Sequence, residues 1–283
     1  MPERHRLRVG LVVGQRESWP ELVRRAQVAE SLGLDTIWVV DHFFGGRDEM
    51  APTHEAYTVL AGLAMATERV RLGVMVAGNT YRNPALLLKQ AITVDHISNG
   101  RVDFGIGAGW WDREHEAYSY EFPSAGDRVT MFEEALAAIE SFQTNERTNF
   151  EGKFYRYVNT PFEPKSLQEG GLPIVIGAGG PRMLGITARY ADIWNTRSPL
   201  DDAVAKSKQL DEKCREIGRD PREIMRSVWP HDNQLGSLDT LTNYITSFRE
   251  QGFDDFQFTW PENDDEMAVV EEAARTVIPE MRG

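Results

Sequence analysis

The sequence predicts an α/β protein, a (β/α)8 TIM barrel with a short insertion before its fifth strand. Short runs of β-branched residues alternate with longer amphipathic segments along nearly all of the 283 residues, which is the pattern of βα units around a parallel sheet. Eight such runs in a chain of this length match a closed barrel. A doubly wound sheet is the alternative, but Gly14-Gln15-Arg16-Glu17 follows the first run where a dinucleotide fold would have Gly-x-Gly-x-x-Gly. We therefore expect one barrel domain over residues 1–283.

The strands and the first helices can be placed from these runs and from end signals. The first helix is expected to begin at Ser18, because Ser18 and Glu21 match a capping box, and to end at Gly33, which suits a left-handed stop. The following helices are expected at 53–67, 84–99 and 128–141. The strands are expected at 7–13, 36–40, 70–76, 102–106, 174–176, 192–195, 225–229 and 256–260.

Residues 149–173 interrupt this alternation. The segment contains Phe150-Glu-Gly-Lys-Phe-Tyr-Arg-Tyr and three prolines, which indicates a hairpin followed by an irregular excursion. We expect it to lie near the active face of the barrel, where a lid would be needed.

Charge and composition exclude several classes of function. With 31 Lys+Arg against 44 Asp+Glu the net charge is −13, so no basic surface for nucleic acid is expected. The single cysteine, Cys214, excludes an intramolecular disulfide and a thiolate-rich metal cage, and we expect it to be inert. The polar N-terminus and the lack of a long apolar run argue against a signal peptide and a membrane span, so a cytoplasmic protein is expected. The run at 112–116 lacks a His-Glu-x-x-His spacing, and we interpret it as a solvated helix face rather than a metal site.

In a barrel, the ligand site is built at the carboxyl ends of the strands. The second strand ends in Asp41-His42, an acid and an imidazole that could form a proton-handling pair. Alternatively, Asp41 caps the loop and His42 is a satisfied, half-buried histidine. The third strand continues through small apolar residues to Asn79, which would let a flat ring lie against the backbone or would simply pack the barrel.

Two glycine-rich turns follow the fourth and fifth strands. They are Gly105-Ile-Gly-Ala-Gly-Trp-Trp and Gly177-Ala-Gly-Gly-Pro. Exposed backbone N–H groups in such turns can bind phosphate oxygens without net positive charge, although glycine is also needed for tight βα turns. Two such turns at neighbouring strand ends favour a phosphate-bearing ligand.

Several longer motifs together carry a family resemblance over nearly the whole chain. They are Trp38-Val-Val-Asp-His-Phe, Glu55, Ala66-Thr-Glu-Arg-Val-Arg-Leu-Gly, Tyr81-Arg-Asn-Pro-Ala, Thr93-Val-Asp-His-Ile-Ser-Asn-Gly-Arg, the fourth-strand glycine turn, Phe122-Pro with Arg128, Pro173-Ile-Val-Ile-Gly-Ala-Gly-Gly and Ala191-Asp-Ile-Trp-Asn. In this combination the chain resembles the bacterial luciferase-like superfamily of flavin and deazaflavin oxidoreductases. Within it, the Asp-His-Phe element and the Gly-Ala-Gly-Trp turn resemble the class that uses coenzyme F420, with FMN-dependent monooxygenases as the alternative.

The resemblance implies a role for each strand end. Asp41 and His42 would lie beside the reactive ring, and Met75-Val76 would be a third-strand bulge, often a non-proline cis peptide, that backs the ring. The cofactor's ribityl-phosphate tail would lie along the glycine turns, at Gly107, Ala108, Gly109, Gly177, Ala178, Gly179 and Gly180. We interpret 95–101 as structural, with Arg101 meeting an internal acid.

One departure from the family bears on the substrate. Relatives that oxidise sugar phosphates carry a glutamate directly after the fourth-strand Gly-x-Gly, whereas this chain has Trp110. Trp110, Trp111, Phe43 and Phe44 would line an apolar mouth suited to a flat or greasy substrate.

The resemblance therefore implies an F420-dependent oxidoreductase that transfers a hydride to or from a small apolar or aromatic molecule. An FMN monooxygenase would additionally need a flavin reductase as partner, and a barrel that binds flavin without turnover is a further alternative. No metal and no membrane partner is expected. A homodimer through the second and third helices is expected, although those helices could equally pack only on the barrel.

Overall fold

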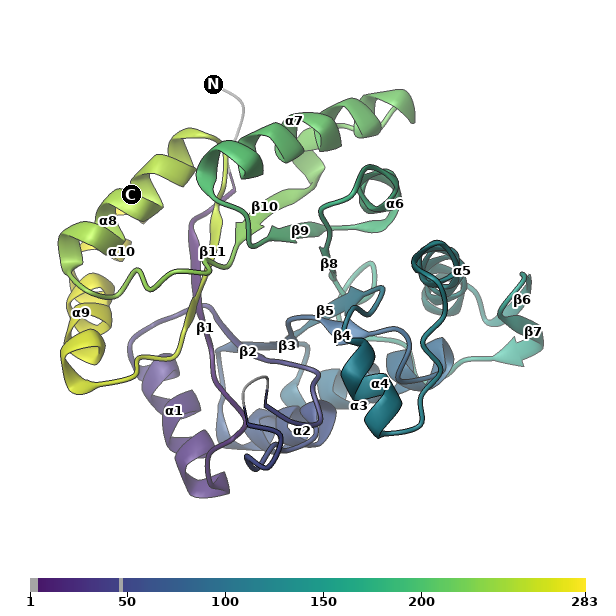
Figure 1. The fold of residues 1–283 in the computed structure, drawn as a ribbon, viewed down its shortest axis with the longest axis horizontal. Helices are drawn as coiled ribbons and strands as arrows, with labels where there is room; N and C mark the ends of the chain where they lie inside the picture. The colour runs from purple at the N-terminus through teal and green to yellow at the C-terminus, as the bar shows by residue number, and fades with distance from the viewer. Residues whose placement is uncertain (1–4, 46–47) are drawn as a thin grey trace.

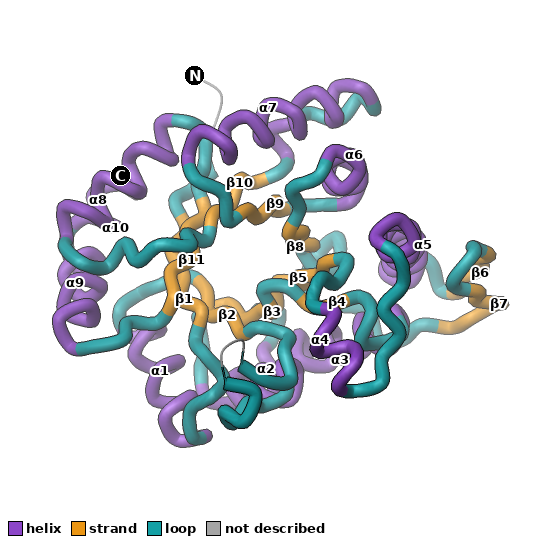
Figure 2. Tube along the Cα trace, viewed as in Figure 1, coloured by secondary structure: helices purple, strands orange, loops and turns teal. Residues whose placement is uncertain are grey.

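The computed structural model describes residues 5–45 and 48–283 and shows a closed parallel barrel surrounded by helices. Figure 2 shows the strands forming a ring inside the helices. The sheet order is β3-β2-β1-β11-β10-β9-β8-β5-β4, and an additional pairing between β3 and β5 closes it. All of these pairings are parallel. The predicted TIM barrel is confirmed.

The barrel strands occupy the predicted runs, with one interruption. They are β1 (Arg8–Val12), β2 (Thr36–Val39), β3 (Arg71–Val74) with its continuation β4 (Ala77–Gly78), β5 (Val102–Gly107), β8 (Ile174–Gly177), β9 (Ile193–Thr196), β10 (Met225–Val228) and β11 (Asp255–Thr259). The predicted third strand is thus split between Val74 and Ala77, and both parts pair with β5.

The helices follow the strands in the order expected of βα units (Figure 1). They are α1 (Trp19–Ser31), α2 (Ala56–Ala66), α3 (Pro84–Ser98), α4 (Asp112–Ala117), α5 (Ala125–Thr144), α6 (Pro181–Tyr190), α7 (Leu200–Glu216), α8 (Leu238–Glu250), α9 (Asp264–Arg275) and α10 (Val277–Arg282), with a 3-10 turn at Pro221–Glu223. No helix in residues 5–45 and 48–283 is long and apolar enough to cross a membrane.

Some predicted helix ends need correction. The Ser18 side chain makes no capping hydrogen bond, and Glu21 instead binds Arg24 and Arg25. A capping box therefore does not form, because two nearby guanidiniums compete for the Glu21 carboxylate. Gly33 does take the expected left-handed conformation, with φ +71°.

Two other helices begin away from the predicted residue. The N-cap of α2 is Glu55, whose carboxylate accepts the N–H groups of Tyr57 and Thr58, so the helix begins later than 53. Ser124 caps α5 by accepting the Asp127 N–H, which places its start before 128. A side-chain acceptor thus decides each start, because it satisfies N–H groups of the first turn that have no partner within the helix.

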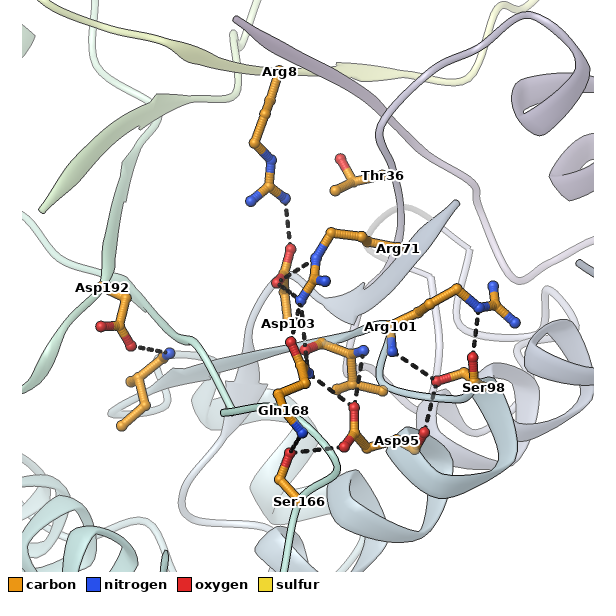
Figure 3. A network of polar contacts seen from close by, with 12 residues as sticks. Arg8, Thr36, Arg71, Asp95, Ser98, Arg101, Asp103, Ser166, Gln168 and Asp192 are labelled. Carbon is orange, nitrogen blue, oxygen red and sulfur yellow. Dashed lines mark hydrogen bonds and ion pairs between the residues drawn. The ribbon is translucent and has the colours of Figure 1, made fainter. Parts of the chain in front are cut away.

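A polar network lies at the amino ends of the barrel strands (Figure 3). Arg8 on β1 and Arg71 on β3 donate to the buried carboxylate of Asp103 on β5 at 2.5 and 2.6 Å. Burial raises the pKa of Asp103, but the two guanidiniums outweigh that effect and the net pKa is lowered. This network holds three strands together at the end opposite to the strand ends that carry the predicted site.

The inserted segment is anchored on the outside of the barrel. The hairpin β6 (Arg147–Glu151) and β7 (Arg156–Pro161) lies beyond α5 in Figure 1. After it, Ser166 Oγ, the Leu167 N–H and Gln168 Nε2 donate to the buried carboxylate of Asp95 on α3 at 2.8, 3.0 and 2.8 Å (Figure 3). Asp95 is therefore structural, because its charge is satisfied by groups of the insertion.

The expectation that Arg101 meets an internal acid was wrong. Arg101 does not meet an acid; its guanidinium donates to the carbonyls of Ser98, Val70, Ala64 and Thr67 and to Thr67 Oγ1. The carbonyls of Ala64, Thr67 and Ser98 lie at the ends of α2 and α3, where they lack partners within their helices, and that of Val70 lies directly before β3. No residue of 149–173 lines the cavity described below, but Tyr155 of the insertion accepts a hydrogen bond from Asn79 Nδ2 at 3.3 Å, directly after β4, and its use as a lid stays a prediction.

Candidate active site

A cavity of about 950 Å³ opens at the carboxyl ends of the strands. It is bounded on one side by the ends of β2 to β5 and on the other by the loops after β8, β9 and β10. Its lining is Val40, Asp41, His42, Met75, Val76, Ala77, Gly78, Tyr81, Gly107, Ala108, Gly109, Trp110, Gly177, Ala178, Gly179, Met183, Asn195, Thr196, Arg197, Ser198, Pro199, Asp202, Lys206, Trp229 and His231. A cavity of this size and position is suited to a small molecule with a cofactor.

The break in the third strand forms one wall of the cavity. The Met75–Val76 peptide is cis, the conformation implied by the family resemblance. Val76 packs between two of the glycine positions: a Cβ built on Gly107 would lie 2.8 Å from Val76 Cγ2, and one on Gly177 would lie 3.4 Å from it. Position 105 tolerates a side chain least of the three, because a Cβ added to Gly105 would lie 1.9 Å from the Val74 carbonyl oxygen. These glycines therefore make room for the bulge.

Asp41 holds the bulge in place. Its carboxylate accepts the Gly78 N–H at 2.9 Å and both terminal nitrogens of Arg82 at 2.7 and 2.9 Å. Arg82 also donates to Glu55 at 2.6 Å. Burial opposes the charge of Arg82, but its hydrogen bonds to Asp41 and Glu55 raise its pKa overall. Asp41 thus ties the end of β2 to the end of β4.

His42 takes a different partner, Glu114 on α4. His42 Nδ1 lies 2.8 Å from Glu114 Oε2, and the same carboxylate accepts the Phe43 N–H and the Tyr81 hydroxyl, the latter at 2.6 Å. Glu114 has no exposed surface. Its burial raises its pKa, but the hydrogen bonds from His42, Tyr81 and Phe43 outweigh this and lower the pKa overall. Burial and the hydrogen bond to Glu114 raise the pKa of Tyr81, which keeps that hydroxyl protonated.

Of the two alternatives left open by the sequence, the Asp41–His42 pair is not found, whereas Asp41 does accept the Gly78 N–H and His42 is half-buried with a hydrogen-bond partner. Both side chains line the cavity, but Asp41 pairs with Arg82 and His42 with Glu114. Adjacent residues at the end of a strand point in different directions, so each meets a different neighbouring element.

The interpretation of 112–116 as a solvated face was wrong for its central residues. Glu114 and His115 are fully buried, and His115 bonds to the Trp111 carbonyl and Thr80 Oγ1 at 2.6 and 2.7 Å. The charge pattern along α4 does not reveal that these two side chains are buried, because the helix is short and their burial comes from the loops after β2 and β4 that pack on it. Within residues 5–45 and 48–283 no cluster of three or more His, Cys, Asp and Glu could hold a metal ion.

The four predicted aromatic residues divide into two groups. Trp110 lines the cavity and has 70% of its surface exposed. Phe43, Phe44 and Trp111 lie outside the lining and pack behind it; Trp111 stacks on Trp110 with ring centroids 5.5 Å apart. The apolar mouth is therefore narrower than expected, with Trp110 as its exposed ring.

Six of the seven residues predicted to bind the cofactor's phosphate tail line the cavity. Gly107, Ala108, Gly109, Gly177, Ala178 and Gly179 line it, whereas Gly180, the N-cap of α6, does not. Positive charge there comes from two residues that sequence reasoning missed. Arg197 stacks on Trp229 at 4.0 Å, and Lys206 donates to Ser198 Oγ and Asp202 at 2.9 and 2.6 Å. A signal was available for Arg197, since Thr196-Arg197-Ser198 directly follows the predicted sixth strand.

Known proteins of related sequence and structure include F420-dependent enzymes. An F420-dependent glucose-6-phosphate dehydrogenase of Amycolatopsis mediterranei is 33% identical over 187 residues, 65% of this chain and 54% of that protein. A 5,10-methylenetetrahydromethanopterin reductase of Methanolobus tindarius is 30% identical over 206 residues, 72% of this chain and 58% of that protein. This chain thus spans little more than half the length of each relative.

The coenzyme F420-dependent tetrahydromethanopterin reductase of Methanopyrus kandleri has the same fold. Its structure superposes with a TM-score of 0.83 over 98% of this chain and 100% of that one, at 18% sequence identity. A family profile described as "Luciferase-like monooxygenase" matches residues 4–231. Because this profile matches most of its length, the chain belongs to the luciferase-like monooxygenase family.

Proposed function

We propose that this protein is a coenzyme F420-dependent oxidoreductase that transfers a hydride between the deazaflavin and a small apolar or aromatic substrate. The observation that carries this proposal is the cavity in which Met75 and Val76, the two glycine turns and His42 face one space. The F420-dependent relatives support the choice of cofactor.

The residues present fit such a cofactor. Met75, Val76 and Ala77 offer an apolar wall against which a planar ring can lie, and Gly107 and Gly177 leave no side chain between that wall and the tail region. The backbone at Ala178 and Gly179, with Arg197 and Lys206, would hold the anionic tail in a protein whose net charge is −13.

When bound, a deazaflavin supplies a ring carbon that accepts or donates a hydride. The protein's own groups act around it. Asp41 and Arg82 hold the bulge that backs the ring, while His42 carries the proton that accompanies hydride transfer. His42 is suited to this role because its half-buried imidazole lines the cavity beside Trp110.

The substrate would meet Trp110 beside His42. Their ring centroids lie 5.8 Å apart in an edge-to-face arrangement, so a flat molecule can lie against the exposed indole while its polar atom reaches the imidazole. The same position would be occupied by a glutamate in the relatives that oxidise sugar phosphates. We therefore propose a planar apolar alcohol or ketone rather than a sugar phosphate.

A turnover panel tests this proposal. Aryl alcohols with oxidised F420, and aryl ketones with reduced F420, are followed through the cofactor's visible absorbance, with glucose 6-phosphate as the sugar-phosphate comparison. We expect turnover of an aryl substrate under anaerobic conditions and none with glucose 6-phosphate. His42→Ala should lower kcat by at least about 100-fold, while His96→Ala, on the outer helix α3, should leave it unchanged.

An FMN monooxygenase gives the opposite pattern in the same panel. It would turn over only with reduced FMN and dioxygen, and a flavin-binding barrel without catalysis would turn over with neither cofactor. Either pattern would contradict the proposal.

We also propose a homodimer formed through α2 and α3. Met65, Leu86 and Ile97 on these helices are 77%, 54% and 39% exposed, so both helices present apolar side chains that a second copy could cover. Light scattering after size exclusion should give twice the mass of 32.1 kDa, and Met65→Glu with Leu86→Glu should reduce it to one chain. A single-chain mass for the unaltered protein would contradict the dimer. The cytoplasmic location stays a prediction, which cell fractionation would test.

A further inference from the structure

Glu114 lies behind the candidate catalytic histidine and accepts three hydrogen bonds without exposing any of its own surface. We infer that Glu114 is a positioning residue that selects the ring tautomer of His42 and leaves Nε2 as the nitrogen free for a substrate. The use of that nitrogen rests on the proposed function, whereas the tautomer can be measured without turnover.

The hydrogen bonds at the Glu114 carboxylate decide which ring nitrogen of His42 carries the proton. The lowered pKa of Glu114 keeps its carboxylate ionised, so that it can only accept hydrogen bonds. The Phe43 N–H can only donate, and the Tyr81 hydroxyl stays protonated. A neutral imidazole has one N–H, and the contact of 2.8 Å between Nδ1 and Glu114 Oε2 requires that N–H to be on Nδ1.

Nε2 is therefore the unprotonated nitrogen of the neutral ring. It has no hydrogen-bond partner among the residues that the structure describes, and the His42 side chain, 26% exposed, lines the cavity. The rings of Trp110 and Trp111 meet it edge to face at 5.8 and 5.2 Å, which limits its rotation. The imidazole thus presents a hydrogen-bond acceptor in a set direction.

This assignment gives a balanced proton path for the proposed reaction. When an alcohol is oxidised, the C–H electron pair and hydrogen leave the carbon as hydride to the cofactor, and the O–H proton passes to Nε2 as the C=O bond forms. The resulting imidazolium keeps its Nδ1–H on the ionised Glu114 carboxylate, which stabilises the charge. In the reverse direction, Nε2–H returns the proton to the carbonyl oxygen while hydride is added to the carbon.

An isosteric substitution should reverse the tautomer. In Glu114→Gln the Phe43 N–H still needs an acceptor, so the amide oxygen must face it. The amide NH₂ then faces His42 Nδ1 and Tyr81, and since it only donates, Nδ1 must become the acceptor. The proton would move to Nε2, and the cavity would receive a donor in place of an acceptor. Glu116→Gln is the matched control, because Glu116 is an exposed carboxylate on the same helix.

Histidine ¹⁵N and ring ¹H correlations measure this directly. The His42 signals are assigned by their loss in His42→Ala, and the neutral form is read at the high-pH end of a titration, where the shifts no longer change. We expect mostly Nδ1–H in the unaltered protein and in Glu116→Gln, and mostly Nε2–H in Glu114→Gln. The dissociation constant for F420 should stay within about threefold in all three proteins, which shows that the cavity is intact.

Two results would overturn the inference. One is a neutral His42 with its proton on Nε2 in the unaltered protein, a measurement that depends on no variant folding. The other is Nδ1–H retained in Glu114→Gln. Failure of F420 to bind would contradict the proposed function and leave the tautomer result standing, so the two can be told apart.

Discussion

The buried pair between Asp41 and Arg82 gives the sharpest stability prediction. In Asp41→Asn, the amide oxygen must stay on the Gly78 N–H, which can only donate. The amide NH₂ then faces the Arg82 nitrogen that now lies 2.9 Å from Asp41 Oδ1, so one charge-assisted hydrogen bond becomes a contact between two donors. The guanidinium, 9% exposed, still donates through its other terminal nitrogen to the oxygen that accepts the Gly78 N–H, and Glu55 is the carboxylate that remains paired with it.

The expected cost follows from these contacts. A hydrogen bond to a charged group contributes about 1.5–3 kcal/mol, and breaking a buried ion pair costs about 3–5 kcal/mol when the remaining charge is left alone. Because Glu55 still pairs with Arg82, we expect Asp41→Asn to lower the free energy of unfolding by about 2–4 kcal/mol. It should also weaken F420 binding, since Gly78 lies in β4, the short strand directly after the bulge.

Urea unfolding at neutral pH measures this change, with tryptophan fluorescence and far-UV circular dichroism recorded on the same samples. The midpoint should fall while the slope m stays constant. Glu21→Gln is the control: Glu21 also binds two arginines but on the exposed α1 surface, so its loss should cost less than about 1 kcal/mol. A cost for Asp41→Asn no larger than that for Glu21→Gln would refute the reasoning.

Three further predictions concern the cavity and pH. Gly107→Ala places a methyl 2.8 Å from Val76 Cγ2 and should raise the dissociation constant for F420 by about tenfold or more, whereas Gly180→Ala, with nothing within 4 Å, should leave it unchanged in the same titration. Arg197→Gln should weaken F420 binding and flatten its dependence on salt concentration, and an unchanged salt slope would contradict a role in holding the anionic tail. The folded-state pKa of Glu114 is lowered from 4.5, so the stability it contributes is present above that value and is lost as the pH falls. The melting temperature of the unaltered protein should therefore fall more steeply below about pH 5 than that of Glu114→Gln, and parallel curves would contradict this.

The fold could be predicted because barrel strands leave a local pattern in the sequence. The run at 102–106 is buried on both faces of the sheet. The strand predicted at 36–40 is observed at Thr36–Val39, so its predicted end differs by one residue. The glycine turns could be predicted as cavity walls for a similar reason, since the position after a barrel strand places a residue at the active face.

The partners of the site residues could not be predicted in the same way. His42 and Glu114 are 72 residues apart, and Asp41 and Arg82 are 41 apart, so their pairing depends on how α4 and the loop after β4 pack on the strand ends. Sequence adjacency offered Asp41 as a partner of His42, beside the alternative of separate roles for the two residues, and charge patterning favoured an exposed Glu114. The pairing and the exposure were both wrong because tertiary contacts decide where a strand-end side chain points.

The central claim is that the cavity holds a deazaflavin against the Met75–Val76 bulge. Equilibrium titration of the purified protein with F420 and with FMN, followed by cofactor absorbance and fluorescence, tests it most directly. We predict saturable binding of F420, at least about tenfold tighter than FMN, with a marked loss of affinity in Gly107→Ala and none in Gly180→Ala. Tighter binding of FMN, or F420 binding that is indifferent to Gly107→Ala, would contradict the claim.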